Sequence, residues 1–396
     1  MNDCRAMSHR TRVVATATAF ILASCARTAR EKVAPIVPPF AAPAVWGALE
    51  PDAYAVRLDT LMRRAPARED WAAAGRPVQI TIWSPASARG TLLTYRDYIA
   101  LTANQASLAP GSAEGSAAAV ERLTRFVTAN GSSAAAMAQW MDMPVAASWN
   151  APRARGRFPL VVIAQGNYHS AYNQAVLGEY LASHGYVVAT SPSPLVLEET
   201  PDSLSLLTRA RRQAADIEYV VEVMRRRDGV DSTRIAVVAH SFGARAAFVA
   251  TADGTPFRAF VSLDGGIGNK LGNDWLAGTA LDSTSLAIPL LHIYQDRDST
   301  VQPDFAAIRR WHRADRTLVH VDEMYHPYFT ALGFVAAVDT GLHVGPPVPE
   351  LGRKVGGVVE LTVAFLDAVM RRGDAAPVLT LGNRPPFSTE HLGEGQ

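Results

Sequence analysis

Three types of side chain in this sequence could together activate a hydroxyl group for attack on a carbonyl carbon. Ser241 lies in the sequence AHSFGA, His326 lies in EMYHPYF, and two aspartates, Asp264 and Asp298, lie between them in the chain. A serine hydroxyl is a weak nucleophile until a histidine removes its proton and an acidic group orients that histidine. The chain order Ser, Asp, His is one in which such sets occur. These residues are therefore the candidate catalytic set.

Ser241 directly follows a short apolar segment, residues 235–239, and precedes a run of small helix-forming residues. An uninterrupted apolar segment of this length indicates a strand that is buried on both faces of a sheet. A strand, a one-residue corner and a helix form a nucleophile elbow, in which a strained serine needs small neighbours. Ala239 and Gly243 are such neighbours. The alternative is a Ser-Gly turn in a nucleotide-binding fold, but no glycine-rich phosphate loop precedes it.

His326 is the candidate general base. It follows a strand expected at 317–321, and the aromatic residues beside it could form the wall of a pocket. His169 is its main rival, but it belongs to the loop after an earlier strand and could line the pocket without acting as the base. His292 and His320 lie inside expected strands, which favours a packing role for both.

The acid that orients the histidine has two candidates. Asp264 ends a strand expected at 259–263, in the sequence SLDGG, where two glycines allow a tight turn. Asp298 follows the next expected strand, in QDRDSTV, and is equally compatible with the chain order. Whichever aspartate is not the acid would satisfy backbone amides of its own loop. The residues alone leave this choice open.

An ester-cleaving serine also needs hydrogen-bond donors for the negative oxygen of the tetrahedral intermediate. The backbone amide of Phe242, the residue after the nucleophile, is the first candidate donor. The loop after the apolar segment 158–164 provides the second, because Gly166 permits close approach of the backbone and Asn167 follows it. The predicted oxyanion hole therefore consists of the amides of Phe242 and Asn167.

Short apolar segments alternate with helical segments along most of the chain. This alternation predicts an α/β fold with a mostly parallel central sheet and helices on both faces. Sheets of this kind bind their ligands at the carboxyl ends of the strands, which is where the candidate residues lie. Strands are expected at 76–84, 158–164, 186–190, 235–239, 259–263, 289–294 and 317–321, and helices at 173–184, 204–227 and 351–370.

The N-terminus resembles an export signal. Arginines precede an apolar run, residues 13–23, that is too short to span a bilayer. The run ends in LASC, which matches a bacterial lipoprotein signal in which Cys25 is lipidated, whereas the alternative is an ordinary secretory signal cleaved nearby. Only Cys4 and Cys25 occur in the chain, so removal of the signal leaves no thiol pair for a disulfide. We expect an exported protein of the cell envelope that is anchored to the membrane by acyl chains.

The composition of the remaining segments indicates how the chain is divided into parts. Prolines among alanines and valines indicate an extended tether, a segment rich in Ala, Ser and Gly indicates a helical insertion, and the Pro- and Gly-rich end is expected to be loose. Residues 265–282 are a candidate lid. The expected parts are the signal at 1–25, the tether at 26–51, the α/β domain at 52–372 with the helical insertion at 102–148, and the tail at 373–396.

The overall composition restricts the partners. The chain has 396 residues, of which 48% are hydrophobic, and a formal net charge of +1. A large core is therefore possible, and nothing indicates a nucleic-acid surface. No H-E-x-x-H motif or Cys/His ligand cluster is present, so neither a metal nor a cofactor is expected. The oligomeric state is not predicted.

Four segments together, AHSFGA, the QGN loop, LASHGYVV and SLDGG, resemble the α/β-hydrolase superfamily. They are most similar to its platelet-activating-factor acetylhydrolase and dienelactone-hydrolase-like branch. The resemblance covers residues 78–84 and 158–370 and implies an α/β-hydrolase fold. It favours Asp264 over Asp298 as the acid. Three departures from the family pattern are Ala239 for glycine, Gln165 for histidine, and a second turn at Asp298.

These features lead to one principal expectation and two alternatives. The chain is expected to be a serine-dependent carboxylic ester hydrolase that acts on small esters of short or modest acyl chain, as the resemblance implies. A catalytically idle binding protein of the cell envelope is the first alternative, which a complete Ser/His/Asp set disfavours. A serine peptidase or acyltransferase on the same fold is the second.

Overall fold

One mixed sheet forms the centre of the structure. The computed structural model describes residues 40–67, 75–105, 111–197 and 204–396. The described strands follow the order β11-β10-β9-β8-β7-β5-β6-β2-β1-β4-β3, in which the six neighbours from β10 to β6 are parallel. The strands are β1 (Ala55–Arg64), β2 (Pro77–Ala86), β3 (Thr91–Thr94), β4 (Pro144–Trp149), β5 (Phe158–Ala164), β6 (Val187–Thr190), β7 (Val230–His240), β8 (Ala259–Leu263), β9 (Leu290–Tyr294), β10 (Arg316–Val321) and β11 (Phe387–Leu392).

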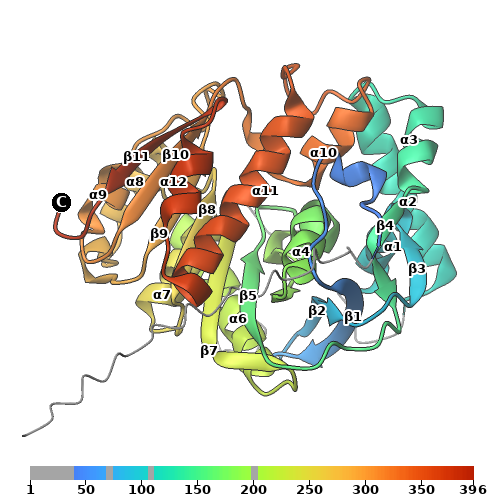
Figure 1. Cartoon of the computed structure of the whole chain (residues 1–396), viewed down its shortest axis with the longest axis horizontal. Helices are drawn as coiled ribbons and strands as arrows, with labels where there is room; N and C mark the ends of the chain where they lie inside the picture. The colour runs from blue at the N-terminus through green and yellow to red at the C-terminus, as the bar shows by residue number, and fades with distance from the viewer. Residues whose placement is uncertain (1–39, 68–74, 106–110, 198–203) are drawn as a thin grey trace, which may run out of the picture. The chain divides into compact units, whose positions relative to one another are not determined.

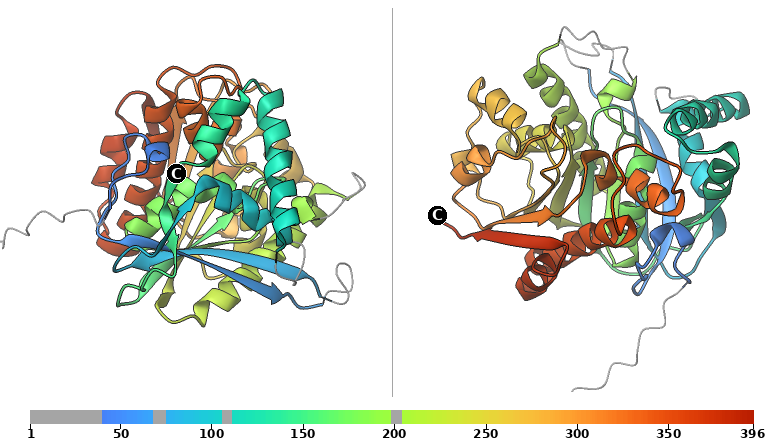
Figure 2. Two further views of the ribbon diagram at one scale, coloured as in Figure 1. Left: turned by 90° about the vertical axis from the view of Figure 1, so that its right-hand side faces the viewer. Right: turned by 90° about the horizontal axis from the view of Figure 1, so that it is seen from above.

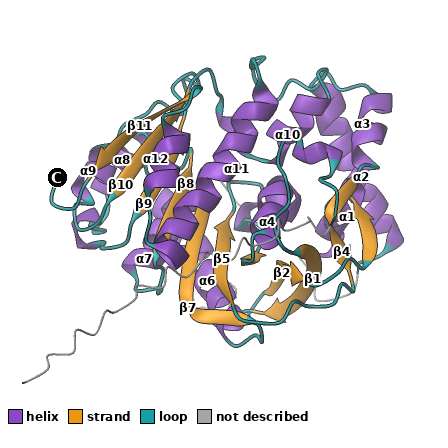
Figure 3. Ribbon diagram, in the orientation of Figure 1, coloured by secondary structure: helices purple, strands orange, loops and turns teal. Residues whose placement is uncertain are grey.

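Helices cover both faces of the sheet (Figure 1) (Figure 3). The core on one face contains residues of α4, α10 and α11, and the core on the other face contains residues of α6 and α7. The helices are α1 (Tyr95–Ala100), α2 (Ala113–Ala129), α3 (Ala134–Met141), α4 (Ala175–Ser183), α5 (Pro194–Leu197), α6 (Leu206–Arg225), α7 (Gly243–Ala252), α8 (Lys270–Ala277), α9 (Ala306–Arg310), α10 (Ala331–Val338), α11 (Leu351–Asp367) and α12 (Ala376–Gly382).

The apolar segments become central strands because both of their faces are covered. In β7, Val238 belongs to the core under α4 and α11, whereas its neighbours Val237 and Ala239 belong to the core under α6 and α7. Side chains alternate between the faces of a strand, so a strand covered on both sides contains no polar position. The seven strands and three helices expected from the sequence are all present, with bounds that differ by a few residues.

The chain reverses its direction across the sheet after β6. From β5 it moves to β6 on one side, and α6 then returns it to β7 on the other side of β5. The carboxyl ends of β5 and β7 therefore form a topological switch point, the place where open α/β sheets bind ligands. The elbow and the predicted oxyanion loop lie at the ends of these two strands.

The segment expected to be a tether is partly built into the domain. Residues 26–39 of it lie outside the described residues, but Trp46 and Leu49 are buried in the core that contains α4. Trp46 Nε1 donates a hydrogen bond to Glu179, which also accepts from Tyr98 Oη and from the backbone amides of Ala146 and Ala147. Residues 40–51 therefore belong at least partly to the packed domain and not to an extended tether. The buried Glu179 carboxylate is held by four hydrogen-bond donors.

The expected helical insertion contains a strand at its end. Helices α2 and α3 lie at the edge of the domain that carries β3 and β4, away from β10 and β11 (Figure 2). Residues 144–148, which were assigned to the insertion, belong to β4 and pair with β1 and β3. The expected boundary at 148 therefore falls within the sheet.

The C-terminal residues are ordered into the sheet, which corrects the expectation of a loose tail. Strand β11 pairs antiparallel with β10 along its whole length, and Arg316 donates hydrogen bonds to the backbone oxygens of Gly393 and Gln396. Without β11, β10 would expose a row of unpaired backbone groups, so the pairing satisfies an otherwise free edge. In the part of the chain described, we find no helix with the length and apolar character needed to cross a bilayer.

Candidate active site

Ser241 has the backbone geometry of a nucleophile elbow. Its φ angle is 54°, which places a non-glycine residue in the left-handed region between the end of β7 and the start of α7. Such strain is retained only where surrounding contacts enforce it. The backbone oxygen of Ser241 accepts hydrogen bonds from the amides of Ala244 and Gly266, and its amide donates to Leu263. The turn is therefore held from both α7 and the loop after β8.

The small residues of the elbow are required by the neighbouring strand. A Cβ atom on Gly243 would lie 2.2 Å from the carbonyl oxygen of Ala164 and 2.6 Å from that of Gln165, distances that real Cβ atoms do not adopt. A glycine at this position lets α7 begin directly against the end of β5. Ala239, which replaces the more usual glycine, is fully buried, so its methyl group is accommodated.

The structure brings Ser241, His326 and Asp264 into one hydrogen-bonded line. Ser241 Oγ lies 2.8 Å from His326 Nε2, and His326 Nδ1 lies 2.6 Å from Asp264 Oδ2. An ionised carboxylate only accepts hydrogen bonds, so Nδ1 carries the proton and Nε2 is free to accept from the serine hydroxyl. This is the tautomer that a general base requires.

Asp264 lies at the carboxyl end of β8 and is buried. Burial raises the pKa of its carboxyl group, whereas the hydrogen bonds from His326 and Gln295 oppose that rise. The side-chain amide of Gln295 donates to Oδ2 at 3.2 Å, and Gln295 itself has no exposed surface. Asp264 also has a positive φ angle of 43°, so its backbone is strained in the same sense as that of Ser241.

Asp298, the other candidate acid, lies apart from the histidine. Its carboxylate accepts hydrogen bonds from the backbone amide and the hydroxyl of Thr300, in a loop after β9. This is the local role expected for the aspartate that is not the acid. The same loop is tied to Asp264 indirectly, because the amides of Arg297 and Asp298 donate to Gln295 Oε1.

Three histidines form a stack beside the nucleophile. The rings of His240 and His326 have centroids 4.9 Å apart, and those of His169 and His240 have centroids 5.2 Å apart with an interplanar angle of 6°. His169 therefore stacks on His240, and it is His326 that lies within hydrogen-bond distance of the serine. Burial lowers the pKa of His169 to about 4 and that of His240 well below its usual value, so both rings are neutral at pH 7.

The amides predicted to form the oxyanion hole lie at the ends of β5 and β7. Neither the Phe242 nor the Asn167 backbone N–H donates a hydrogen bond to another described residue. The two loops touch, since a Cβ on Gly166 would lie 3.2 Å from Ser241 Cβ and 2.8 Å from His240 Nδ1. Two amide donors thus remain available next to the nucleophile.

Gln165 anchors the loop that carries Asn167. Its side chain donates to Thr190 Oγ1 at the end of β6, and its backbone oxygen accepts from Gln213 Nε2 of α6. Gln165 therefore binds the loop to the sheet and to a helix. It leaves the main-chain amide of Asn167 unused.

Two residues at the site had not been singled out from the sequence. Gln295 binds Asp264, and Arg245 donates from Nε to the backbone oxygen of Gly266, which holds the turn after β8. Gln295 directly follows β9, so its place at a strand's carboxyl end could have identified it. Arg245 lies inside a run of small residues in α7 and carries no comparable signal. Within the described ranges, no group of three or more His, Cys, Asp or Glu side chains could hold a metal ion.

Comparison with solved structures identifies the fold. A ferulic acid esterase from Streptomyces cinnamoneus superposes with a TM-score of 0.56 at 19% identity, covering 84% of this chain and 97% of the esterase. The chain has the α/β-hydrolase fold. The expected fold class is thereby confirmed. No family model matches the sequence.

Sequence comparison finds cutinases that are similar to part of this chain. Cutinase 2 of Thermobifida cellulosilytica is 27% identical over 202 residues, which cover 50% of this chain and 65% of the cutinase. A cutinase of Thermobifida fusca is also 27% identical over 202 residues, covering 54% of its own length. A cutinase of Thermobifida alba is 33% identical over 94 residues, which is 23% of this chain. The matched region thus spans less than two thirds of each of these relatives.

Proposed function

We propose that this chain is a serine-dependent carboxylic ester hydrolase that forms an acyl-enzyme on Ser241. The observation that carries the proposal is the line from Ser241 Oγ through His326 to Asp264, with contacts of 2.8 and 2.6 Å. The relatives found by sequence are cutinases, and the structural neighbour is a ferulic acid esterase, which supports an ester as the substrate. We further propose that the acyl chain is short or of modest length.

In the proposed reaction, the Ser241 hydroxyl attacks the ester carbonyl while His326 Nε2 accepts its proton. The imidazolium that forms is stabilised by the Asp264 carboxylate and then protonates the departing alcohol. Water, deprotonated by His326, attacks the acyl-enzyme in the same way, releases the acid and restores Ser241. Each step moves one proton through Nε2, and none requires a metal or a redox group.

The negative oxygen of both tetrahedral intermediates is assigned to the amides of Phe242 and Asn167. These donors are available before the substrate binds, because no described residue accepts from them. Preorganised donors of this kind are each worth about 3–4 kcal/mol of transition-state stabilisation.

Two alternatives use the same fold. An idle binding protein would have no need of a histidine in the tautomer that a base requires, and the strain at Ser241, with φ 54°, would serve no purpose. A serine peptidase or acyltransferase would share the acyl-enzyme and differ in the bond cleaved or the acceptor used. Product analysis with amide substrates and with added alcohols separates these from an esterase.

The proposed function is tested with p-nitrophenyl acetate and p-nitrophenyl butyrate. We expect turnover by the wild type and a loss of at least about a thousandfold in kcat for Ser241→Ala and for His326→Ala. Folding of each variant is checked by its thermal unfolding curve. Turnover that persists in a folded Ser241→Ala variant would exclude the acyl-enzyme on this residue.

Export and lipidation at Cys25 remain part of the proposal, as does the place of the chain in the platelet-activating-factor acetylhydrolase and dienelactone-hydrolase-like branch. Both rest on sequence motifs, and residues 1–39 lie outside the described residues. Metabolic labelling of the full chain with a fatty-acid probe tests the anchor. Incorporation into the wild type that is lost in Cys25→Ala is the expected result, and equal labelling of both would exclude Cys25 as the lipidated residue.

A further inference from the structure

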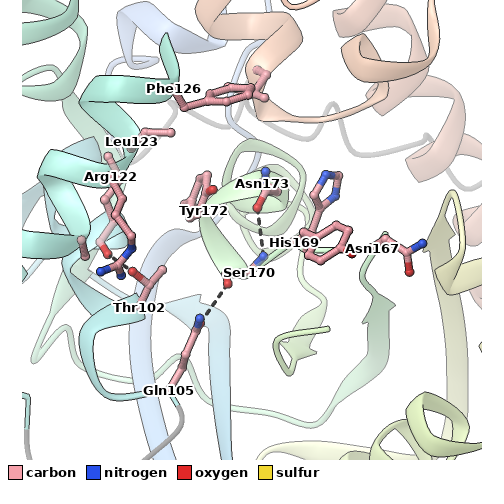
Figure 4. A pocket seen from close by; sticks show the side chains of 14 residues that line it. Thr102, Gln105, Arg122, Leu123, Phe126, Asn167, His169, Ser170, Tyr172 and Asn173 are labelled. Atoms are coloured by element: carbon pink, nitrogen blue, oxygen red, sulfur yellow. Dashed lines mark hydrogen bonds between the residues drawn. The ribbon is translucent and has the colours of Figure 1, made fainter. Parts of the chain in front are cut away.

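A cavity of about 380 Å³ lies between α2 and the loop that follows β5 (Figure 4). Its size is within the range of pockets that bind small molecules. Asn167 and His169 form one side of it, and Arg122 and Phe126 of α2 form the opposite side. It therefore extends from the loop that carries the proposed oxyanion donor towards the helical insertion.

Two exposed aromatic residues line this cavity. Phe126 is 46% exposed and Tyr168 is 66% exposed, and these are the two largely exposed aromatic side chains among the described residues. Tyr168 also has a positive φ angle of 60°, directly after Asn167. Tyr168 and Phe126 thus expose aromatic surface to the same cavity, and the backbone of Tyr168 is strained beside the proposed oxyanion donor.

The cavity contains a single charge. Of its fourteen lining residues, Arg122 is the one ionised group, since burial keeps His169 neutral and no carboxylate is present. Arg122 is exposed and makes no hydrogen bond or ion pair with another described residue. The guanidinium presents a planar set of donors that matches a carboxylate.

The remaining walls combine apolar surface with a few fixed polar groups. Leu123 and Leu332 contribute apolar surface, whereas Ser170 Oγ is already engaged by Gln105 at 2.8 Å. The Ser170 amide is similarly bound by the side-chain oxygen of Asn173. A flat apolar group can thus enter without displacing a hydrogen bond of the wall.

We propose that this cavity binds the part of the ester remote from the scissile bond, and that it selects esters in which this part is an aromatic ring bearing a carboxylate. The carbonyl oxygen lies at the amides of Phe242 and Asn167, the ring lies between Phe126 and Tyr168, and the carboxylate pairs with Arg122. The inference rests on the proposed ester hydrolase function. The ring can belong to the acyl part or to the alcohol part of the ester.

Two matched substrate pairs test this specificity and distinguish the two parts. Methyl 4-carboxyphenylacetate and methyl 4-carbamoylphenylacetate carry the ring on the acyl side, and 4-carboxybenzyl acetate and 4-carbamoylbenzyl acetate carry it on the alcohol side. Within each pair a carboxylate is replaced by a neutral amide of the same shape. The measured quantity is the ratio of kcat/KM for the carboxylate to kcat/KM for the amide, with hydrolysis followed by chromatography.

We expect this ratio to be about 1.5 to 5 in one of the two pairs, which is the size of the effect of an exposed ion pair. Arg122→Gln should reduce the ratio to about one, and Arg122→Lys should retain part of it. Arg125→Gln is the matched control, because Arg125 is exposed on the same helix but does not line the cavity. Phe126→Ala should raise KM for both members of the selected pair.

The outcomes separate the specificity from the activity itself. If the wild type hydrolyses p-nitrophenyl acetate but the ratio is near one in both pairs, or is unaffected by Arg122→Gln, the cavity does not select a carboxylate and the inference is wrong. If the wild type hydrolyses no ester, the proposed function is refuted and the inference falls with it. A ratio that falls equally in Arg125→Gln would indicate a general field effect of α2 and would also overturn the inference.

Discussion

Replacing Asp264 with asparagine tests the assignment that the sequence left open. The Asp264 Oδ2 atom meets two donors, His326 Nδ1 at 2.6 Å and Gln295 Nε2 at 3.2 Å. If the asparagine turns its NH₂ group towards His326, Nδ1 must become the acceptor and the ring proton moves to Nε2. That proton then points at Ser241, and the imidazole cannot act as a base. If the amide oxygen faces His326 instead, the tautomer is kept but the negative charge that stabilises the imidazolium is lost.

We expect Asp264→Asn to lower kcat by about 10³- to 10⁴-fold, which corresponds to about 4–5.5 kcal/mol of transition-state stabilisation. The assay is turnover of p-nitrophenyl butyrate at pH 7.5, with thermal unfolding as the check on folding. The side chain keeps its shape, so the fold should be retained. We therefore expect kcat to fall while the thermal unfolding curve stays close to that of the wild type.

Asp298→Asn is the matched control for this prediction. The Asp298 carboxylate binds Thr300 and makes no contact with His326, so kcat should stay within about twofold of the wild type. A folded Asp264→Asn variant that retains more than a tenth of the wild-type kcat would refute the reasoning. A larger loss in Asp298→Asn than in Asp264→Asn would reverse the assignment of the acid.

Three further predictions concern stability and folding. Burial lowers the pKa of His169 to about 4 in the folded state, against about 6.5 in the unfolded state, so the free energy of unfolding should fall as the pH drops between these values. In urea unfolding, the free energy of unfolding of His169→Gln should fall by about 2 kcal/mol less than that of the wild type between pH 7.5 and pH 5. Equal losses in the two proteins would contradict this prediction. Glu179→Ala leaves four buried donors without an acceptor, so the free energy of unfolding measured with urea should fall by about 4 kcal/mol or more. A loss below about 1 kcal/mol would show that these hydrogen bonds are not needed for stability. Gly243→Ala places a methyl group 2.2 Å from the Ala164 carbonyl oxygen and should cost about 3 kcal/mol, whereas Gly278→Ala, with its nearest contact at 3.5 Å, should be close to neutral.

The central strands and the elbow could be predicted because they depend on local patterns. A strand covered on both faces must be apolar throughout, and residues 235–239 and 158–164 show this directly. The carboxyl ends of such strands then indicate which polar residues can meet. The predictions of Ser241 and His326 as neighbours depended on this rule, which requires no knowledge of the loops.

The edges of the sheet were harder to predict. Strand β1 alternates buried Val56 and Leu58 with Arg57 and Asp59, a period-two signal that was present in the sequence but was not used. Strands β4 and β11 pair with strands that lie far away in the chain, so local pattern alone does not identify them. Whether such a segment forms a strand depends on the strand with which it pairs, and the sequence of the segment alone does not identify that partner.

The choice between Asp264 and Asp298 also lay beyond local pattern. Both follow a strand and both lie in turns. What separates them is that β8 lies directly beside β7, while β9 lies one strand further away, so the end of β8 is nearer to the elbow. Strand order in the sheet therefore decides the contact, and the sequence of one chain does not provide that order.

The most direct test of the account is the intact mass of the domain after incubation with a fluorophosphonate. A protein lacking residues 1–25 is treated alongside Ser241→Ala, and each is analysed by mass spectrometry. We expect one adduct on the wild type, located at Ser241 by peptide mapping, and none on the variant. Absence of an adduct on folded wild-type protein, or an adduct that persists in Ser241→Ala, would contradict the claim that this serine is an activated nucleophile.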